Sequence, residues 1–325
     1  MSVIAGCSLF SGVILLADCR VTIKRYGKPD VLCDNAQKLF HLTDTTAFGF
    51  VGDLNTASPM IKELFRQLSL SHKKCRTNRL HPLSILKWIP RYFRSFYRQL
   101  SKRQNVGRVD FMVGSVILDR QNVIDRSKVV EIMERFRLRK LSIQRNWMPS
   151  ILVNILQANT PHVILSDVPA NLLYYMQSQD FIPQHLAPLE FAAIGSGQDT
   201  IVEIDRNADW IFAGDVGNSF MEASALRQTV SSFVEKNSIL SVGGMYPVIK
   251  IHSKGLELLG HSSQIPVGGP SFELKIDSGG RWVQRNSVTG KEIKLLFPWE
   301  IDPQKLKKDE RFDDLKDALN KFRTA

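Results

Sequence analysis

The sequence predicts an α+β protein in which strands and helices occupy separate blocks of the chain. Two observations support this class. The predicted elements follow the order strands, two helices, strands, insertion, strand, helix, strands, with no regular βαβ alternation. In addition, 325 residues with 43% hydrophobic side chains suffice to fill a large core without disulfides or metals. A peptide hormone, a disulfide scaffold and a disordered tail are therefore excluded.

Four strands are predicted before residue 52. Residues 3–8 and 12–17 are apolar runs joined by a Ser-Gly turn, which predicts a hairpin. Because the second run is apolar at every position, we expect a strand covered on both faces. Residues 38–42 and 46–51 also fit strands.

Two helices are predicted next. Residues 55–70 carry apolar side chains at helical spacing behind polar residues that could cap a helix. Residues 82–102 form the second predicted helix, with Pro90 bending or dividing it.

The rest of the chain predicts further strands, a helical insertion and a C-terminal extension. Strands are expected at residues 111–119, 191–194, 243–252, 256–259, 272–276 and 282–286, and helices at 218–236 and 303–322. The charged segment 121–157 is predicted to be an insertion, and the composition changes near Gly260. We therefore expect one domain at residues 2–259 and an extension with a hairpin and a charged helix at 260–325.

Cysteine spacing and hydropathy indicate a soluble, unexported, cytoplasmic protein. The cysteines show no Cys-x-x-Cys spacing and no nearby histidine pair; they are Cys7, Cys19, Cys33 and Cys75. Reduced, buried thiols and no metal or cofactor are expected. The apolar runs are shorter than the roughly 20 residues of a bilayer crossing, so no membrane contact is expected.

The net charge of +11 is concentrated in one segment. Residues 71–109 contain eleven of the 43 Lys and Arg residues and no acidic residue, so the remainder is balanced. Within it, basic side chains recur every three or four residues, at Lys87, Arg91, Arg94, Arg98 and Lys102. This stripe is either a solvated helix face over an aromatic stripe or a surface for nucleic acid or an acidic protein.

Ser2 is a candidate nucleophile. The chain enters an apolar strand at its third residue, whereas most termini fray, so this end is predicted to be held in place. Removal of Met1 would leave the α-amine of Ser2 beside its own hydroxyl. An α-amine titrates at about 7.7–8.0, so it can act as the general base without a histidine. The alternative is that Met-Ser is an ordinary chain start.

Charged residues are predicted to lie near this serine. Asp18 and Arg20 end the second strand of the hairpin, and Lys38 opens the next strand. A cation near the α-amine would lower the pKa of that amine and make the free base more available. The alternative is a structural ion pair between Asp18 and Arg20.

These residues resemble the proteasome β-type N-terminal nucleophile (Ntn) hydrolases, including bacterial proteasome-like relatives. The matching positions are Ser2, Asp18-x-Arg20, Lys38, Gly49-Phe50-Val51-Gly52 and Ala193-Ile194-Gly195-Ser196-Gly197. The resemblance covers roughly residues 2–70, 109–119 and 190–259. It implies a four-layer αββα sandwich, a homo-oligomer, and an amide-bond hydrolase or protease that acts on a polypeptide or small amide.

The resemblance also implies roles for the matching residues. Ser2 would be the nucleophile and Asp18 and Lys38 a supporting charge pair. Arg20 would brace Asp18, and Ser196 would orient the amine. The oxyanion donor would be the backbone N–H of Gly52, or of Gly49 if the hairpin register differs. Alone, Gly195-Ser196-Gly197 would be a plain turn.

The sequence departs from the family pattern at two places. Lys38 lies four residues beyond the family spacing, which a longer hairpin at residues 26–29 could absorb. Ile239 and Val242 stand where many members carry polar residues that support the amine. The alternative function is therefore a weakly catalytic, proteasome-like scaffold whose basic helix binds an acidic partner or nucleic acid.

Overall fold

The computed structural model contains both α-helices and β-strands, and its sheets are antiparallel, as the α+β class predicts. The structure describes residues 2–25, 28–74, 82–138, 157–208, 211, 219–239, 241–244, 246–259, 272–277, 280–286, 290 and 292–301.

The first large sheet contains the N-terminal strand at its interior. Its five strands, in spatial order, are β10 (Phe191–Gly195), β1 (Val3–Ser8), β2 (Gly12–Ala17), β11 (Val248–His252) and β12 (Gly255–Leu259). Every residue of β1 and β2 is buried, because both faces of the sheet are covered. The predicted hairpin and its burial are thus confirmed.

The second large sheet is built around a long hairpin. Its strands, in spatial order, are β5 (Leu39–Thr43), β6 (Thr46–Gly52), β7 (Val109–Asp125), β8 (His162–Met176) and β9 (Gln184–Leu186). Because β7 pairs with β8 up to Asp125, the predicted insertion begins inside a strand rather than after one. Helix α3 (Arg126–Leu138) follows β7.

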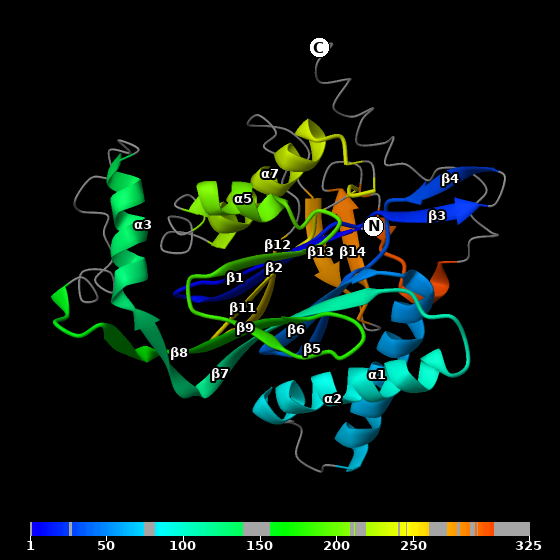
Figure 1. The fold of residues 1–325 in the computed structure, drawn as a ribbon, viewed down its shortest axis with the longest axis horizontal. Helices are drawn as coiled ribbons and strands as arrows, with labels where there is room; N and C mark the ends of the chain where they lie inside the picture. The colour runs from blue at the N-terminus through cyan, green and yellow to red at the C-terminus, as the bar shows by residue number, and fades with distance from the viewer. Residues whose placement is uncertain are drawn as a thin grey trace.

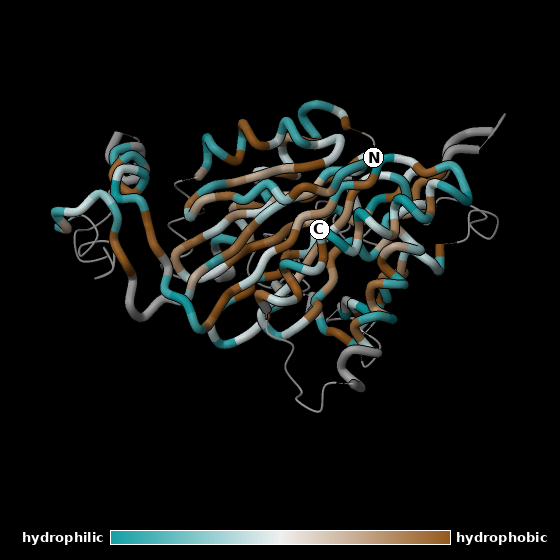
Figure 2. The backbone as a smooth tube through the Cα atoms, turned by 60° about the horizontal axis from the view of Figure 1, so that its bottom comes forward, coloured by the Kyte–Doolittle hydropathy of each residue, from teal (hydrophilic) through white to brown (hydrophobic). Residues whose placement is uncertain are grey.

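The two sheets pack face to face. Ile4 and Leu15 of the first sheet share a buried cluster with Met112 and Leu173 of the second. A Cβ on Gly6 would lie 2.5 Å from Met112 Sδ, and one on Gly49 would lie 2.7 Å from Ile4 Cδ1. A larger residue at either position would displace these side chains, so glycine allows the two sheets to approach closely. Figure 2 shows that hydrophobic residues concentrate on the central strands.

Helices cover the outer faces of both sheets (Figure 1). Helices α1 (Leu54–Lys74) and α2 (Pro82–Ser101) share a buried cluster with the second sheet. Helices α5 (Thr200–Arg206) and α7 (Ser219–Lys236) share another with the first. The described elements therefore stack in the order helices, sheet, sheet, helices. None of the described helices combines the length and apolarity needed to cross a membrane.

Local interactions explain where the first two helices form. Asp53 precedes α1, and its Oδ2 accepts a hydrogen bond from the backbone N–H of Thr56 at 2.9 Å, which caps the helix. In α2 the buried apolar stripe includes Phe93, whose ring stacks on Phe111 at a centroid distance of 4.0 Å. Pro90 lies inside α2 without ending it.

Two smaller sheets complete the fold. The predicted extra hairpin is formed by β3 (Val21–Arg25) and β4 (Lys28–Cys33), and its turn residues 26 and 27 lie outside the described part. The C-terminal sheet contains β13 (Phe272–Ile276), β14 (Trp282–Asn286) and β15 (Glu292–Lys294), followed by the 3-10 helix η2 (Pro298–Glu300). The predicted helix at 303–322 lies outside the described residues.

The C-terminal sheet is anchored in the core between the large sheets. Trp282 and Leu295 are both 0% exposed and belong to the inter-sheet cluster. Leu296 forms a parallel bridge with Ala36, and its backbone N–H donates to the carbonyl of Asn35 at 2.7 Å. The segment that leads into β5 is therefore held by residues near the end of the described chain.

Candidate active site

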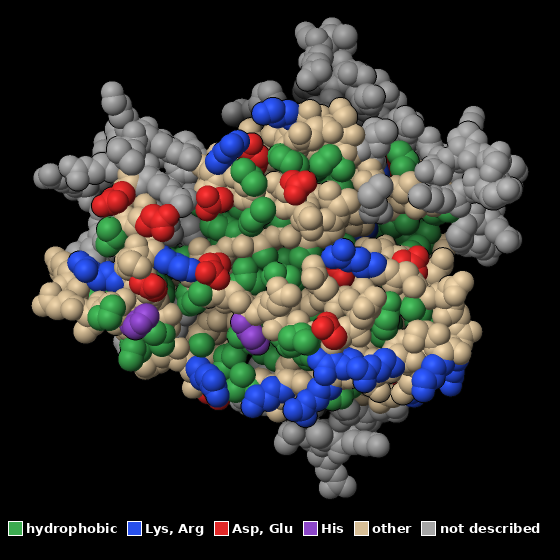
Figure 3. All heavy atoms as spheres, in the orientation of Figure 1, with side chains coloured by type: hydrophobic (Ala, Val, Ile, Leu, Met, Phe, Trp, Pro, Cys, Tyr) green, Lys and Arg blue, Asp and Glu red, His purple; other side chains and the backbone are tan. Residues whose placement is uncertain are grey.

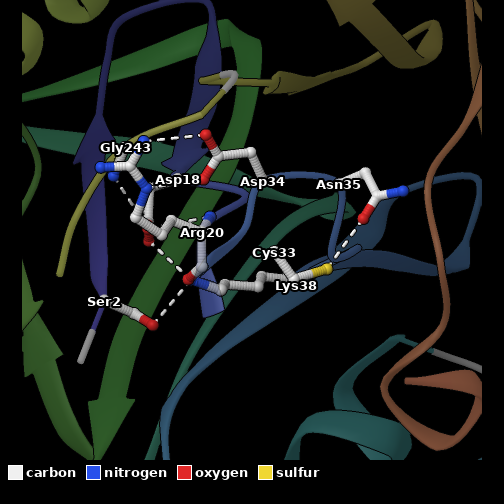
Figure 4. A network of polar contacts seen from close by, with 8 residues as sticks. All are labelled: Ser2, Asp18, Arg20, Cys33, Asp34, Asn35, Lys38 and Gly243. Carbon is white, nitrogen blue, oxygen red and sulfur yellow. Dashed lines mark hydrogen bonds and ion pairs between the residues drawn. The ribbon is translucent and has the colours of Figure 1, made fainter. Parts of the chain in front are cut away.

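Three buried side chains form a hydrogen-bonded row at the start of β1 (Figure 4). Lys38 Nζ lies 2.7 Å from Ser2 Oγ and 2.9 Å from Asp18 Oδ1. Ser2 is 4% exposed, Lys38 1% and Asp18 0%. The sequence-predicted nucleophile and its charge pair are therefore in direct contact.

The strand register places these residues together. In the β1–β2 hairpin Ile4 faces Ala17, so Asp18 lies beside Val3. Val3 N–H donates to Asp18 Oδ1 at 2.9 Å, and Asp18 N–H donates to the Val3 carbonyl at 3.2 Å. Lys38 directly precedes β5, which was predicted to begin at Lys38 itself, and the Lys38 carbonyl accepts from Phe50 N–H of β6 at 3.2 Å. The site thus lies where the two sheets meet.

All three N–H groups of the Lys38 ammonium have acceptors. Two are Ser2 Oγ and Asp18 Oδ1, and the third is the carbonyl oxygen of Arg20. An ammonium that donates to the serine oxygen stabilises negative charge that develops on that oxygen. Lys38 in this arrangement supports the hydroxyl electrostatically, so a different group must accept the hydroxyl proton.

Asp18 is surrounded by donors. Its Oδ2 accepts from the backbone N–H of Arg20 at 3.2 Å and of Gly243 at 3.3 Å. Burial raises the pKa of Asp18, and the Lys38 ammonium and the N–H groups of Val3 and Gly243 oppose that rise. The carboxylate therefore depends on these donors to remain ionised.

The resemblance implies that Arg20 braces Asp18, but the Arg20 guanidinium is directed to another carboxylate. This guanidinium forms two hydrogen bonds with Asp34, at 2.6 Å to Oδ1 and 2.8 Å to Oδ2. These bonds raise the pKa of Arg20. The main chain of Arg20 contacts both Asp18 and Lys38, since its N–H donates to Asp18 Oδ2 and its carbonyl accepts from Lys38 Nζ. A Cβ on Gly243 would lie 2.6 Å from Arg20 Cζ, so a larger residue at position 243 would displace the guanidinium.

Ser196 contacts the main chain of the nucleophile. Its Oγ donates to the Ser2 carbonyl at 3.3 Å. The preceding Gly195 has a φ of +95°, and a Cβ there would lie 2.1 Å from the Ser2 carbonyl oxygen. Gly195 and Ser196 therefore pack closely against the backbone of Ser2 at the start of the N-terminal strand.

Ser2 opens into a cavity of about 680 Å³, a size typical of ligand pockets. Gly52 lines it and has a φ of +111°, a conformation that favours glycine. Gly49 does not line it, because this residue faces the core between the sheets next to Leu39. Of the two proposed oxyanion donors, only Gly52 lies at the cavity. Charged groups at the cavity are Lys38, Asp53, Arg108, Asp110 and Asp199.

The apolar residues Ile239 and Val242 belong to the core between the first sheet and helices α5 and α7. The adjacent main chain takes part instead: Gly243 donates to Asp18 Oδ2, and its carbonyl accepts from Cys19 N–H at 3.2 Å. Backbone groups at this segment thus contact Asp18 directly.

Sequence reasoning missed two polar residues of this region. Asp34 pairs with Arg20, and Gln37 bonds to the C-terminal sheet, since its Oε1 accepts from Trp282 N–H at 3.0 Å. Gln37 is 1% exposed between buried Ala36 and Lys38, where a polar side chain needs partners, but this burial is not apparent from the sequence. Nor does any signal in the sequence join Arg20 to Asp34.

Two of the cysteines lie close to this network: Cys19 follows Asp18 in the chain, and Cys33 Sγ donates to Asn35 Oδ1 at 2.8 Å (Figure 4). Cys7, Cys19 and Cys33 are buried, unbridged thiols, and Cys75 lies outside the described residues. Burial raises the pKa of the Cys19 thiol, which keeps it neutral and unreactive. Within the described ranges, no group of His, Cys, Asp and Glu side chains is arranged to hold a metal ion.

The predicted basic stripe lies on α2 and the turn that follows it. Its side chains, which do not line the cavity, are Lys87, Arg91, Arg94, Arg98 and Lys102.

The sequence has no match among known protein families, and no curated protein is significantly similar to it.

Proposed function

We propose that this chain is a proteasome-like Ntn hydrolase that cleaves amide bonds, most simply in peptides, with Ser2 as its nucleophile. The observation that carries the proposal is the Ser2–Lys38–Asp18 row, in which Ser2 precedes the N-terminal strand and, with Lys38, lines a cavity. The stack of two sheets between helices supports the αββα sandwich that the family has.

The proposed reaction requires a free α-amine on Ser2. Once Met1 is removed, that amine takes the proton from Ser2 Oγ while Oγ attacks the substrate carbonyl carbon. The Lys38 ammonium stabilises the charge on Oγ, and the backbone N–H of Gly52 is the proposed donor to the oxyanion.

The second half of the reaction returns the enzyme to its starting state. The protonated amine gives its proton to the leaving nitrogen as the amide C–N bond breaks, which leaves an ester on Ser2. Water then attacks the ester carbonyl carbon while the amine takes its proton, and the amine returns this proton to Ser2 Oγ as the C–Oγ bond breaks and the acid product leaves. Asp18 positions Lys38 through their ion pair in both steps.

The test combines intact mass with covalent labelling. The purified protein should lack the mass of Met1 and should react with an epoxyketone, a reagent that bonds to both a hydroxyl and its neighbouring free α-amine. Ser2→Ala should abolish labelling and peptide hydrolysis, whereas Ser84→Ala, at an exposed position on α2, should change neither. A retained Met1, or equal labelling of the Ser2→Ala variant, would refute the proposal.

A further inference from the structure

The basic face of α2, defined as Lys87, Arg91, Arg94, Arg98 and Lys102, is a surface rich in positive charge. Figure 3 shows Lys and Arg side chains gathered in a row along this edge of the molecule. Four of the five residues are exposed, and Arg94 is half-buried. With a helical rise of about 1.5 Å per residue, the row is about 22 Å long.

These charges lack acidic partners among the described residues. None of the five appears in an ion pair with a described Asp or Glu, and Arg94 instead donates to the backbone carbonyl of Asp180. Within the helix itself there is no acidic residue. Like charges on one helix face repel each other, so a polyanion that neutralises them would bind favourably.

The apolar side of α2 is already occupied. Ile85, Ile89 and Phe93 are buried, and Trp88 and Tyr92 stack on each other at 4.7 Å while packing against the same core. No apolar stripe is therefore left to enter a lipid bilayer. The aromatic rings are likewise not on the basic face, where they could stack with unpaired bases.

The basic face also lacks what a protein partner ordinarily needs. Stable protein interfaces have an apolar core from which charged residues are depleted. Here, the exposed residues between the cations, such as Ser84, Ser95 and Gln99, are polar. Arginine is suited to phosphate, because its planar guanidinium can form two parallel hydrogen bonds.

We propose that the basic face of α2 binds the phosphate backbone of a nucleic-acid duplex without reading its sequence. A duplex carries about one charge per 1.7 Å of axis, so a 22 Å row spans about thirteen phosphates and can neutralise five of them. DNA and RNA duplexes share this chemistry. Binding does not depend on Ser2.

The experiment measures fluorescence anisotropy with labelled 24-base-pair DNA and RNA duplexes between 50 and 200 mM salt. Five phosphate contacts predict a slope of about −4.5 in log affinity against log salt, which is a loss of about 500-fold over that range. The triple variant Lys87→Gln/Arg91→Gln/Arg98→Gln should reduce the slope by about 2.7. Arg94 is left intact because its guanidinium bonds to Asp180.

The matched control removes three exposed charges elsewhere: Arg120→Gln/Lys254→Gln/Lys294→Gln. Both triple variants have the same net charge, so a local site predicts that the control keeps the wild-type slope. Ser2→Ala should bind the duplex as the wild type does, which separates this proposal from hydrolysis. Equal slopes for the two triple variants would overturn the proposal. So would tighter binding to a single strand or to polyglutamate than to either duplex, or no binding to a duplex at 50 mM salt.

Discussion

Replacing Lys38 by methionine tests whether Lys38 and Asp18 form a buried ion pair that stabilises the folded protein. Methionine has a similar length but no charge, so Lys38→Met leaves the Asp18 carboxylate 0% exposed with only backbone donors. Removing one partner of a buried ion pair typically costs about 3–5 kcal/mol. We expect the free energy of unfolding to fall by about that amount at pH 7, and hydrolysis to be lost.

The loss of stability should depend on pH in a defined direction. Burial already raises the pKa of Asp18, and Lys38 opposes that rise, so the pKa is higher still in the variant. An acid with a higher pKa in the folded state adds stability below its unfolded pKa and loses it as pH rises through the folded pKa. The deficit should therefore shrink as the pH falls from 7 to 5, by at most about 1.4 kcal/mol per pH unit for one proton.

The assay is urea unfolding followed by tryptophan fluorescence at pH 7 and pH 5. Wild type and variant can be compared if the free energy of unfolding falls with urea concentration at the same slope in both. Lys62→Met, at an exposed position on α1, is the matched control and should change stability by less than about 0.5 kcal/mol. A deficit below about 1 kcal/mol at pH 7 would refute the reasoning, as would one that is the same at both pH values.

Other predictions address the core, the thiols and the support of the nucleophile. Trp282→Ala should lower the free energy of unfolding by about 3–5 kcal/mol because the side chain is 0% exposed between the sheets; a change below about 1 kcal/mol in urea unfolding would contradict that placement. Burial raises the pKa of Cys19, so iodoacetamide at pH 8 should leave this thiol unmodified in the folded protein and alkylate it in urea, as peptide mass mapping would show. Gly195→Ala should abolish hydrolysis, since its Cβ would lie 2.1 Å from the Ser2 carbonyl oxygen, whereas Gly290→Ala, which also has positive φ but no atom within 4 Å, should retain it.

Strands with a continuous apolar run and a turn beside them could be predicted from the sequence. The predicted bounds of β1, β2, β13 and β14 agree with the structure because each strand pairs with a near neighbour in the chain. The strand β8 was missed, because Ser166, Asp167 and Pro169 interrupt its apolar pattern. Its conformation depends on pairing with β7.

In the site, too, contacts between residues near in the chain could be predicted, whereas contacts between distant segments could not. The place of Asp18 beside Val3 follows from a short hairpin, and the resemblance adds Lys38. The pairing of Arg20 with Asp34 and the bonds from Gln37 to the C-terminal sheet depend on how distant segments pack. Gly49 was considered as an oxyanion donor only because the strand register was unknown.

The bonds between Gln37 and the C-terminal sheet have a consequence for protein synthesis. Gln37 lies next to Lys38, yet its side chain bonds to Gly280 and Trp282, and its backbone N–H to Leu296. These partners are translated more than 240 residues later. A nascent chain can therefore form the Ser2–Asp18 hairpin early, but the segment that holds the lysine gains its final support only after nearly the whole described chain has been translated. A ribosome-bound chain that stops before Trp282 would carry the nucleophile without a fully supported charge pair beside it.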